Sequence, residues 1–166
     1  MNKATPFILI GAGFLLLFLT QNAMAATALS QITVITDWLI PQFEGFSPSS
    51  YWDVSRWSIG YGTQAAGPGI TITKQQALED MREVVQANYA YLRPMITREL
   101  SPNQWAALMS FAYNLGPGNA DNLVDNINSG DDAALGTQWM RYVMAGGVEN
   151  SALVKRRAKE WEVWQG

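Results

Sequence analysis

The stretch FEGFSPSSYWDVSRWSIGYGT, residues 43–63, holds two carboxylates, Glu44 and Asp53, among glycines, serines and aromatic residues. Glu44 follows an apolar segment and precedes Gly45, as a residue at the end of a helix does. A helix C-terminus carries partial negative charge, so it favours the protonated form of an acid placed there. Glu44 is therefore either a proton donor or an ordinary surface glutamate, and its position alone leaves the two alternatives even.

Asp53 lies in a turn-rich segment between Trp52 and Val54, and aspartate is common in turns. Taken alone, it is expected to be a turn residue. Two carboxylates that flank a glycosidic bond are nevertheless the minimum apparatus for hydrolysing a sugar polymer. The aromatic residues nearby would suit the walls of a glycan cleft, although core packing is the expected role for most of the seven tryptophans.

The composition narrows the chemistry. The chain has 166 residues, is 48% hydrophobic and 15% charged, and contains neither cysteine nor histidine. Disulfides, thiolate metal sites and histidine-based triads are therefore excluded, which leaves carboxylates, tyrosine or lysine for acid–base work. We expect no metal and no cofactor. The net charge of −3 gives no indication of a nucleic-acid partner, and the basic run at residues 155–159 is expected to be a solvated helix face.

Residues 1–26 are expected to direct export. Lys3 precedes an uninterrupted apolar run from Pro6 to Leu19, and Ala23-Met24-Ala25 fits the small-residue rule for signal cleavage. The run is short for a full membrane span of about 20 residues. Cleavage after Ala25 and retention as a signal anchor are both open. Residues 27–166 then form the folded domain.

Periodicity and capping signals predict an α+β fold that is mainly helical. We expect a small helix-plus-sheet lobe over residues 27–72, an all-helical lobe after it, and a ligand cleft between them. The predicted helices cover 27–46 (interrupted by Pro41), 73–92, 105–115, 121–128, 132–144 and 152–164, and the predicted short strands cover 57–63 and 70–72. A capping box at Thr73 is expected to open one helix, and Ser101, followed by Pro102 at the first helical position, is a second start signal.

Over residues 35–164 the chain resembles the phage-type lysozymes, glycoside hydrolase family 24. Each of the matching motifs is short, but together they follow one another in the family's order at compatible spacing. They are Glu44-Gly45, Tyr51-Trp52-Asp53, Ser58-Ile59-Gly60-Tyr61-Gly62, Ile70-Thr71-Ile72-Thr73 with Gln76-Ala77, Ser110 to Gly116, Asn128 to Asp131, Ala145-Gly146-Gly147 and Leu153 to Glu160. The resemblance implies a lysozyme-like fold of two lobes.

The resemblance also implies site residues. Glu44 matches the family's general acid, and Asp53, nine residues on, matches its second carboxylate. The third position departs from the pattern, because the family's threonine should stand where Ile59 is found; Ser58 is assigned its role. Tyr61 and Asn114 are assigned to substrate binding.

Glu44 is expected to need a cationic partner if it is buried near the junction of the lobes. Arg156 or Arg157 could reach it from the last helix. A solvent-facing position for both arginines is the alternative.

The function implied by the resemblance is that of an endolysin: a bacteriolytic muramidase that hydrolyses the β-1,4 bond between N-acetylmuramic acid and N-acetylglucosamine in peptidoglycan. We expect a monomer whose partners are glycan strands and, if the leader is kept, the membrane, as in signal-anchor-release endolysins. It would be tethered to the inner membrane and then periplasmic, or secreted after cleavage. The alternatives are a lytic transglycosylase and a non-catalytic membrane-tethered virion or wall-binding protein of the same fold.

Overall fold

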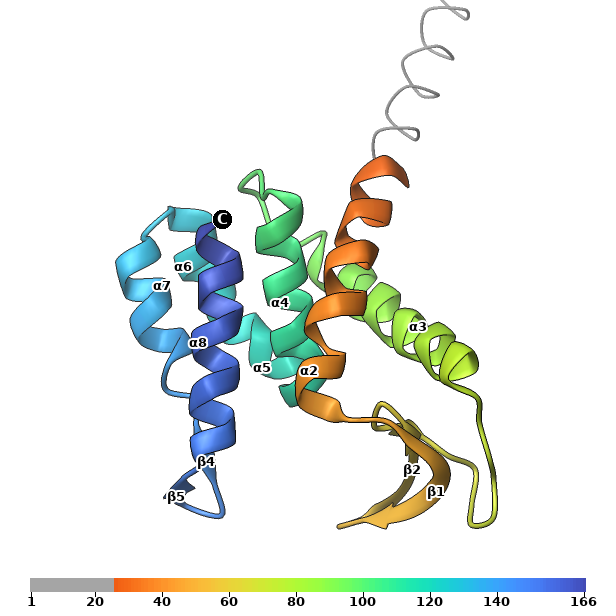
Figure 1. Cartoon of the computed structure of the whole chain (residues 1–166). Coiled ribbons are helices and arrows are strands. Elements are labelled where there is room, and N and C mark those ends of the chain that lie inside the picture. Colours follow the sequence, from red (N-terminus) through yellow and green to blue (C-terminus); the bar gives the residue numbers. More distant parts are fainter. Residues whose placement is uncertain (1–25) are drawn as a thin grey trace, which may run out of the picture.

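The computed structural model describes residues 26–166, which fold into a small antiparallel sheet beside a larger helical body (Figure 1). The predicted α+β class, mainly helical and with two lobes, is confirmed. The predicted signal or anchor segment lies outside the described residues, apart from residue 26. Among residues 26–166, no helix combines the length and the apolar character that crossing a membrane requires.

The sheet lobe is built from β1 (Ser47–Asp53), β2 (Arg56–Gly60) and β3 (Thr63–Gln64), in that order and antiparallel. Tyr51 pairs with Ser58 and Asp53 with Arg56, so a turn of only two residues joins β1 to β2. The single strand predicted at 57–63 is divided between two strands in the structure, β2 and β3. The strand predicted at 70–72 is wrong, since only Thr71 forms a single bridge there, to Ser49.

A close backbone approach docks this lobe on α3 (Lys74–Leu92). Gly60, at the end of β2, has φ +64°, and a Cβ built on it would lie 2.8 Å from the Cβ of Ala77. A side chain is excluded here twice, by backbone conformation and by space. The sheet therefore sits directly against the first turn of the long helix.

The chain enters this lobe through a helix over residues 26–39 and the short α2 (Pro41–Glu44). Pro41 interrupts the predicted helix by starting a new one, because a proline at the first helical position loses no hydrogen bond. Arg82 of α3 binds Asp37 through two guanidinium nitrogens, the shorter contact being 2.6 Å. This pair ties the first helix to α3.

The core of the helical body is α4 (Pro102–Leu115), which is buried on all sides from Trp105 to Ala112. The predicted capping box is present at Thr73, which opens α3 with Gln76, and the start signal predicted at Ser101 is a second capping box, which opens α4 with Gln104. Each box satisfies two backbone donors that a helix start would otherwise leave unpaired. α4 packs against α3 and against α8 (Ser151–Gln165), the last helix of the chain.

The remaining elements lie beside α4 and α8, and the last of them, a small hairpin, leads into the start of α8 (Figure 1). The helix predicted at 132–144 ends five residues early, and the two glycines after it form the turn of a small hairpin rather than a simple break. The elements are α5 (Pro117–Ala120), η1 (Asp121–Leu123), α6 (Val124–Ser129), α7 (Asp132–Trp139), β4 (Met144–Ala145) and β5 (Val148–Glu149).

Candidate functional site

Glu44 stands where the two lobes meet. It is the last residue of α2, and Gly45, with φ +65°, turns the chain from that helix into β1. The side chain is 20% exposed, and its Oε1 atom accepts a hydrogen bond from the Nη1 group of Arg156 on α8. The other oxygen, Oε2, faces the backbone of Gly62, where an added Cβ would lie 3.6 Å away. One oxygen is thus held and the other is left facing the loop between β2 and β3.

Arg156 is held in turn by buried groups. Its side chain is 4% exposed. Its Nε group donates to Oε1 of Glu160 at 3.0 Å and its Nη2 group to the backbone carbonyl of Ser110 at 3.2 Å. The guanidinium also lies over the ring of Phe43, 5.3 Å from the centroid, where a cation–π attraction adds to the hydrogen bonds. All three nitrogens of Arg156 are therefore occupied, and only Nη1 points to Glu44.

Arg157 does not pair with Glu44. Its Nη2 group donates to Oδ1 of Asn114 and to Oε1 of Glu160, both at 3.0 Å, and the side chain is fully buried. Burial lowers the pKa of Arg157 to about 10, against the opposing effect of Glu160. The expectation that residues 155–159 form a solvated face is wrong for Arg156 and Arg157, since α8 turns exactly these two toward the core.

Glu160 is a residue that the sequence did not single out. It is fully buried and accepts hydrogen bonds from Ser110 Oγ at 2.7 Å and from Trp139 Nε1 at 3.2 Å, besides both arginines. Burial raises the pKa of its carboxyl, while the two guanidinium groups and the Ser110 hydroxyl oppose that rise. The one signal for it in the sequence is its spacing of four and three residues from Arg156 and Arg157.

Asp53 has a different environment. It ends β1 at the exposed turn, and within residues 26–166 its carboxylate makes no hydrogen bond or ion pair. Tyr51 connects it to Glu44 electrostatically: burial raises the pKa of the Tyr51 phenol, and the charges of Asp53 and of Glu44 raise it further. Both carboxylates therefore lie within electrostatic range of one side chain.

Ser58 is fully buried on β2, and its hydroxyl has no hydrogen-bond partner among the described residues. Tyr61 is only 2% exposed; its ring is part of the core and packs on Phe46 at 5.8 Å. Tyr61 therefore packs in the core, and its assignment to substrate binding stays a prediction. Asn114 is partly exposed and is held by Arg157.

Tyr113 completes the surroundings of Glu44 and was not predicted. Its hydroxyl donates to the backbone carbonyl of Tyr61 at 2.8 Å, which joins α4 to the loop after β2. Burial raises the pKa of this phenol, and the charge of Glu44 adds to the rise. Tyr113 is therefore a neutral, fixed neighbour of the acid at neutral pH.

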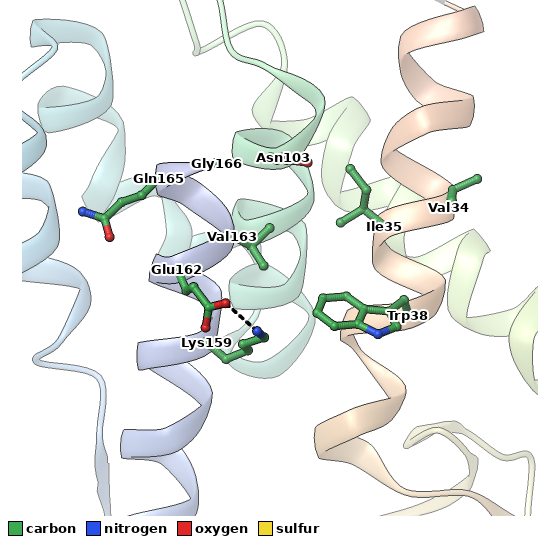
Figure 2. A pocket seen from close by; sticks show the side chains of 9 residues that line it. All are labelled: Val34, Ile35, Trp38, Asn103, Lys159, Glu162, Val163, Gln165 and Gly166. Carbon is green, nitrogen blue, oxygen red and sulfur yellow. Dashed lines mark hydrogen bonds and ion pairs between the residues drawn. The ribbon is translucent and has the colours of Figure 1, made fainter.

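A groove of about 640 Å³ lies elsewhere, between the helix of residues 26–39 and the end of α8. Figure 2 shows Trp38 on one wall and the ion pair of Lys159 with Glu162 on the other. Neither carboxylate of the predicted site lines it. The charged pair in the groove is partly exposed, whereas Glu44 meets the buried guanidinium of Arg156. In residues 26–166 no cluster of His, Cys, Asp and Glu has the arrangement of a metal site.

Several known proteins are similar to this chain in sequence. The chain is 34% identical over 129 residues to an endolysin of Bacillus phage PZA, an alignment that covers 74% of this chain and 50% of that protein. It is 31% identical to an endolysin of Acyrthosiphon pisum secondary endosymbiont phage 1, over 74% of this chain and 89% of the relative. A SAR-endolysin of Enterobacteria phage PA-2 is 30% identical over 72% of this chain and 76% of its own length. The chain spans about half the length of the two Bacillus phage endolysins that it matches.

Among solved structures, the muramidase domain of SpmX from Asticaccaulis excentricus superposes with a TM-score of 0.74 at 24% identity, over 79% of this chain and 95% of that domain. At that identity the likeness shows the fold alone. The family model of phage lysozyme matches residues 41–160, from the start of α2 to Glu160. This match takes in both carboxylates and the buried arginines, and the chain belongs to the phage lysozyme family.

Proposed function

We propose that the protein is a muramidase that cleaves the β-1,4 bond between N-acetylmuramic acid and N-acetylglucosamine in peptidoglycan, and that Glu44 is its general acid. One observation carries the proposal. Glu44 is a partly exposed carboxyl at the junction of the lobes, with Oε1 fixed by a buried guanidinium and Oε2 unpaired within residues 26–166. A carboxyl oriented through one oxygen can present the other to a leaving group.

In the proposed reaction, protonated Oε2 of Glu44 donates its proton to the glycosidic oxygen as the bond from that oxygen to the anomeric carbon breaks. The carboxylate of Asp53 stabilises the positive charge that develops on the sugar ring. A water molecule that Asp53 orients adds its oxygen to the anomeric carbon, and its spare proton leaves through Asp53 to solvent. Ser58 contributes only if the sheet opens, because its hydroxyl is enclosed in this conformation.

The products of digestion test this reaction against its nearest rival. A hydrolase leaves a reducing N-acetylmuramic acid end, whereas a lytic transglycosylase needs no activated water and leaves a 1,6-anhydro end. We expect reducing ends from purified peptidoglycan, detected by mass spectrometry after borohydride reduction. Anhydro ends alone would refute hydrolysis and leave Asp53 without a chemical role.

A non-catalytic wall-binding protein is the second candidate, and a specific observation favours it. Ile59 stands where the family's threonine is expected, and Ser58, which was assigned that role, is enclosed on β2. A turbidity assay on chloroform-treated Gram-negative cells separates the two functions. A binder would sediment with the walls and leave the turbidity constant, while a muramidase would clear the suspension.

Export is proposed on the apolar residues 6–19 and on the similarity to a SAR-endolysin. The protein would act in the periplasm or outside the cell, after release from the membrane or cleavage of the leader. The mass of the exported protein distinguishes these routes. A mass that lacks residues 1–25 indicates cleavage, and the full mass in a membrane fraction indicates a retained anchor. Full-length protein confined to the cytoplasm would refute export.

A further inference from the structure

We infer that Glu160 is a positioning residue for the proposed general acid, acting on Glu44 through the guanidinium of Arg156. The inference rests on the proposed function and extends the site from one ion pair to four alternating charges. These four charges, which we call the buried charge chain, are Glu44, Arg156, Glu160 and Arg157.

The contacts of Glu160 leave its carboxylate a single orientation. Oε1 accepts from Ser110 Oγ at 2.7 Å and from Arg156 Nε at 3.0 Å, and Oε2 accepts from Trp139 Nε1 at 3.2 Å. The donors come from α4, α7 and α8, so three helices fix one side chain. Because a guanidinium is planar, holding its Nε group also sets the direction of Nη1, the group that binds Glu44. A change in the orientation of the Glu160 carboxylate would therefore change the direction of the Nη1 group that binds Glu44.

The buried charge chain contains equal numbers of acidic and basic side chains. The two guanidiniums and the two carboxylates sum to zero when Glu44 has given up its proton, and three of the four side chains are no more than 4% exposed. A nearby positive charge favours the ionised form of a carboxyl, and a general acid must be protonated. Glu160 offsets the second arginine, so that Glu44 faces one guanidinium rather than the field of two. Salt screens buried charges only weakly, so a change of charge at one end of the buried charge chain is felt at Glu44 at the other end.

The titratable and charged groups around Glu160 are few. Ser110 faces it from α4, Trp139 from α7, and the two arginines from α8 itself. Only the arginines are charged. Tyr113 lies near Glu44 and Arg156, and burial keeps its phenol neutral. A change of charge within the buried charge chain should therefore act on Glu44 without being compensated by the titration of another group.

The test compares the pH dependence of turnover on peptidoglycan for the full protein and two variants that change the charge in opposite directions. Glu160→Gln leaves an excess positive charge beside Glu44, which favours ionisation of the acid. In this variant the alkaline limb of the pH–turnover profile is expected to lie about one pH unit lower than in the wild type, and turnover at neutral pH is expected to be about tenfold lower. Arg157→Gln leaves an excess negative charge, and its alkaline limb is expected to move up. A merely structural role would lower the melting temperature and move neither limb.

A pair of matched tryptophan variants tests the geometry without changing the charge. Trp139→Phe removes the donor to Oε2 of Glu160 and keeps an aromatic ring, so kcat should fall several-fold with KM unchanged. Trp105→Phe removes a similarly buried indole that does not contact the buried charge chain. The ring of Trp105 packs on Tyr89, with the ring centroids 4.7 Å apart, and this variant should leave kcat unchanged. If Glu160→Gln does not fold, the direction of the Arg157→Gln limb and this pair decide the question.

The outcomes separate the inference from the proposed function. If Glu44→Gln keeps full activity, the proposed function fails. If Glu44→Gln is inactive while the two charge variants keep the wild-type limbs, only the role of Glu160 is overturned. Limbs that move in the same direction in both variants would also overturn it, because a charge effect must change sign.

Discussion

The two carboxylates of the site are nine residues apart in sequence and are supported in opposite ways. Glu44 is anchored by Arg156, which is itself held by groups from α4 and α8. Asp53 ends β1 beside an exposed two-residue turn, and its carboxylate makes no hydrogen bond or ion pair among residues 26–166. The contrast teaches that one acid is placed by the buried core and the other by the geometry of a hairpin. Changes at the first should alter chemistry, and changes around the second should be tolerated better.

Removing the acid gives the largest expected effect. Glu44→Gln keeps the size of the side chain and loses the proton, so activity on cell walls should fall about a thousandfold, within the range that general acids contribute. Arg156 keeps its bonds to Glu160 and to the Ser110 carbonyl, and the protein should stay folded. Turbidity clearance measures the activity, and circular dichroism checks the fold. A folded variant that retains a tenth of the activity would contradict the role of Glu44.

Removing the second carboxylate should cost less. Asp53 is exposed, and an interaction between charges in water is several times weaker than one in a partly buried site. We expect Asp53→Asn to lower turnover about a hundredfold with an unchanged melting temperature, since no contact is lost. Asp53→Glu is the control that keeps the charge. A loss in Asp53→Asn as large as in Glu44→Gln would mean that both acids are equally placed by the fold.

Ser58→Ala should separate stability from chemistry. The hydroxyl is buried and unpaired within the described residues, and such a group costs about 1 kcal/mol or more. The variant should therefore melt about 2–4 °C higher while its turnover falls less than tenfold. The measurement is a thermal melt beside the turbidity assay. An unchanged melting temperature with a loss as large as in Asp53→Asn would place the hydroxyl in the reaction.

The turn beside Asp53 gives the smallest expected effect. Val54 has φ +50° and is 92% exposed, a conformation that a β-branched residue adopts only at a cost. Val54→Gly should relieve about 1 kcal/mol, raise the melting temperature by about 2 °C and leave turnover within twofold. Val34→Gly, in the first helix, is a control that should destabilise the protein. Destabilisation by Val54→Gly would show that the turn is not strained.

The parts of the fold that the sequence predicted are the local ones. The capping boxes at Thr73 and Ser101 are complete within four residues, and the apolar run of α4 indicates burial without reference to any partner. β1 was missed because Ser47 to Ser50 have little preference for a strand. They are held there by β2 and by a bridge to Thr71, contacts that depend on distant residues.

The site shows the same division. The resemblance supplied Glu44 and Asp53, and the need of a buried acid for a cation supplied Arg156 or Arg157, of which the structure pairs Arg156 with Glu44. Glu160 could not be found this way, because a glutamate near the end of a charged helix has the pattern of a surface residue. Only the packing of Ser110 and Trp139 around it shows that it faces inward.

The most direct test of the central claim is the dependence of the rate on the leaving group. A general acid is needed in proportion to the basicity of the oxygen that departs. On a peptidoglycan-derived glycoside with a dinitrophenolate leaving group, Glu44→Gln should approach the wild-type rate to within about tenfold, while Asp53→Asn stays as impaired as on cell walls. An equal loss for Glu44→Gln on both substrates would show that Glu44 does not deliver the proton.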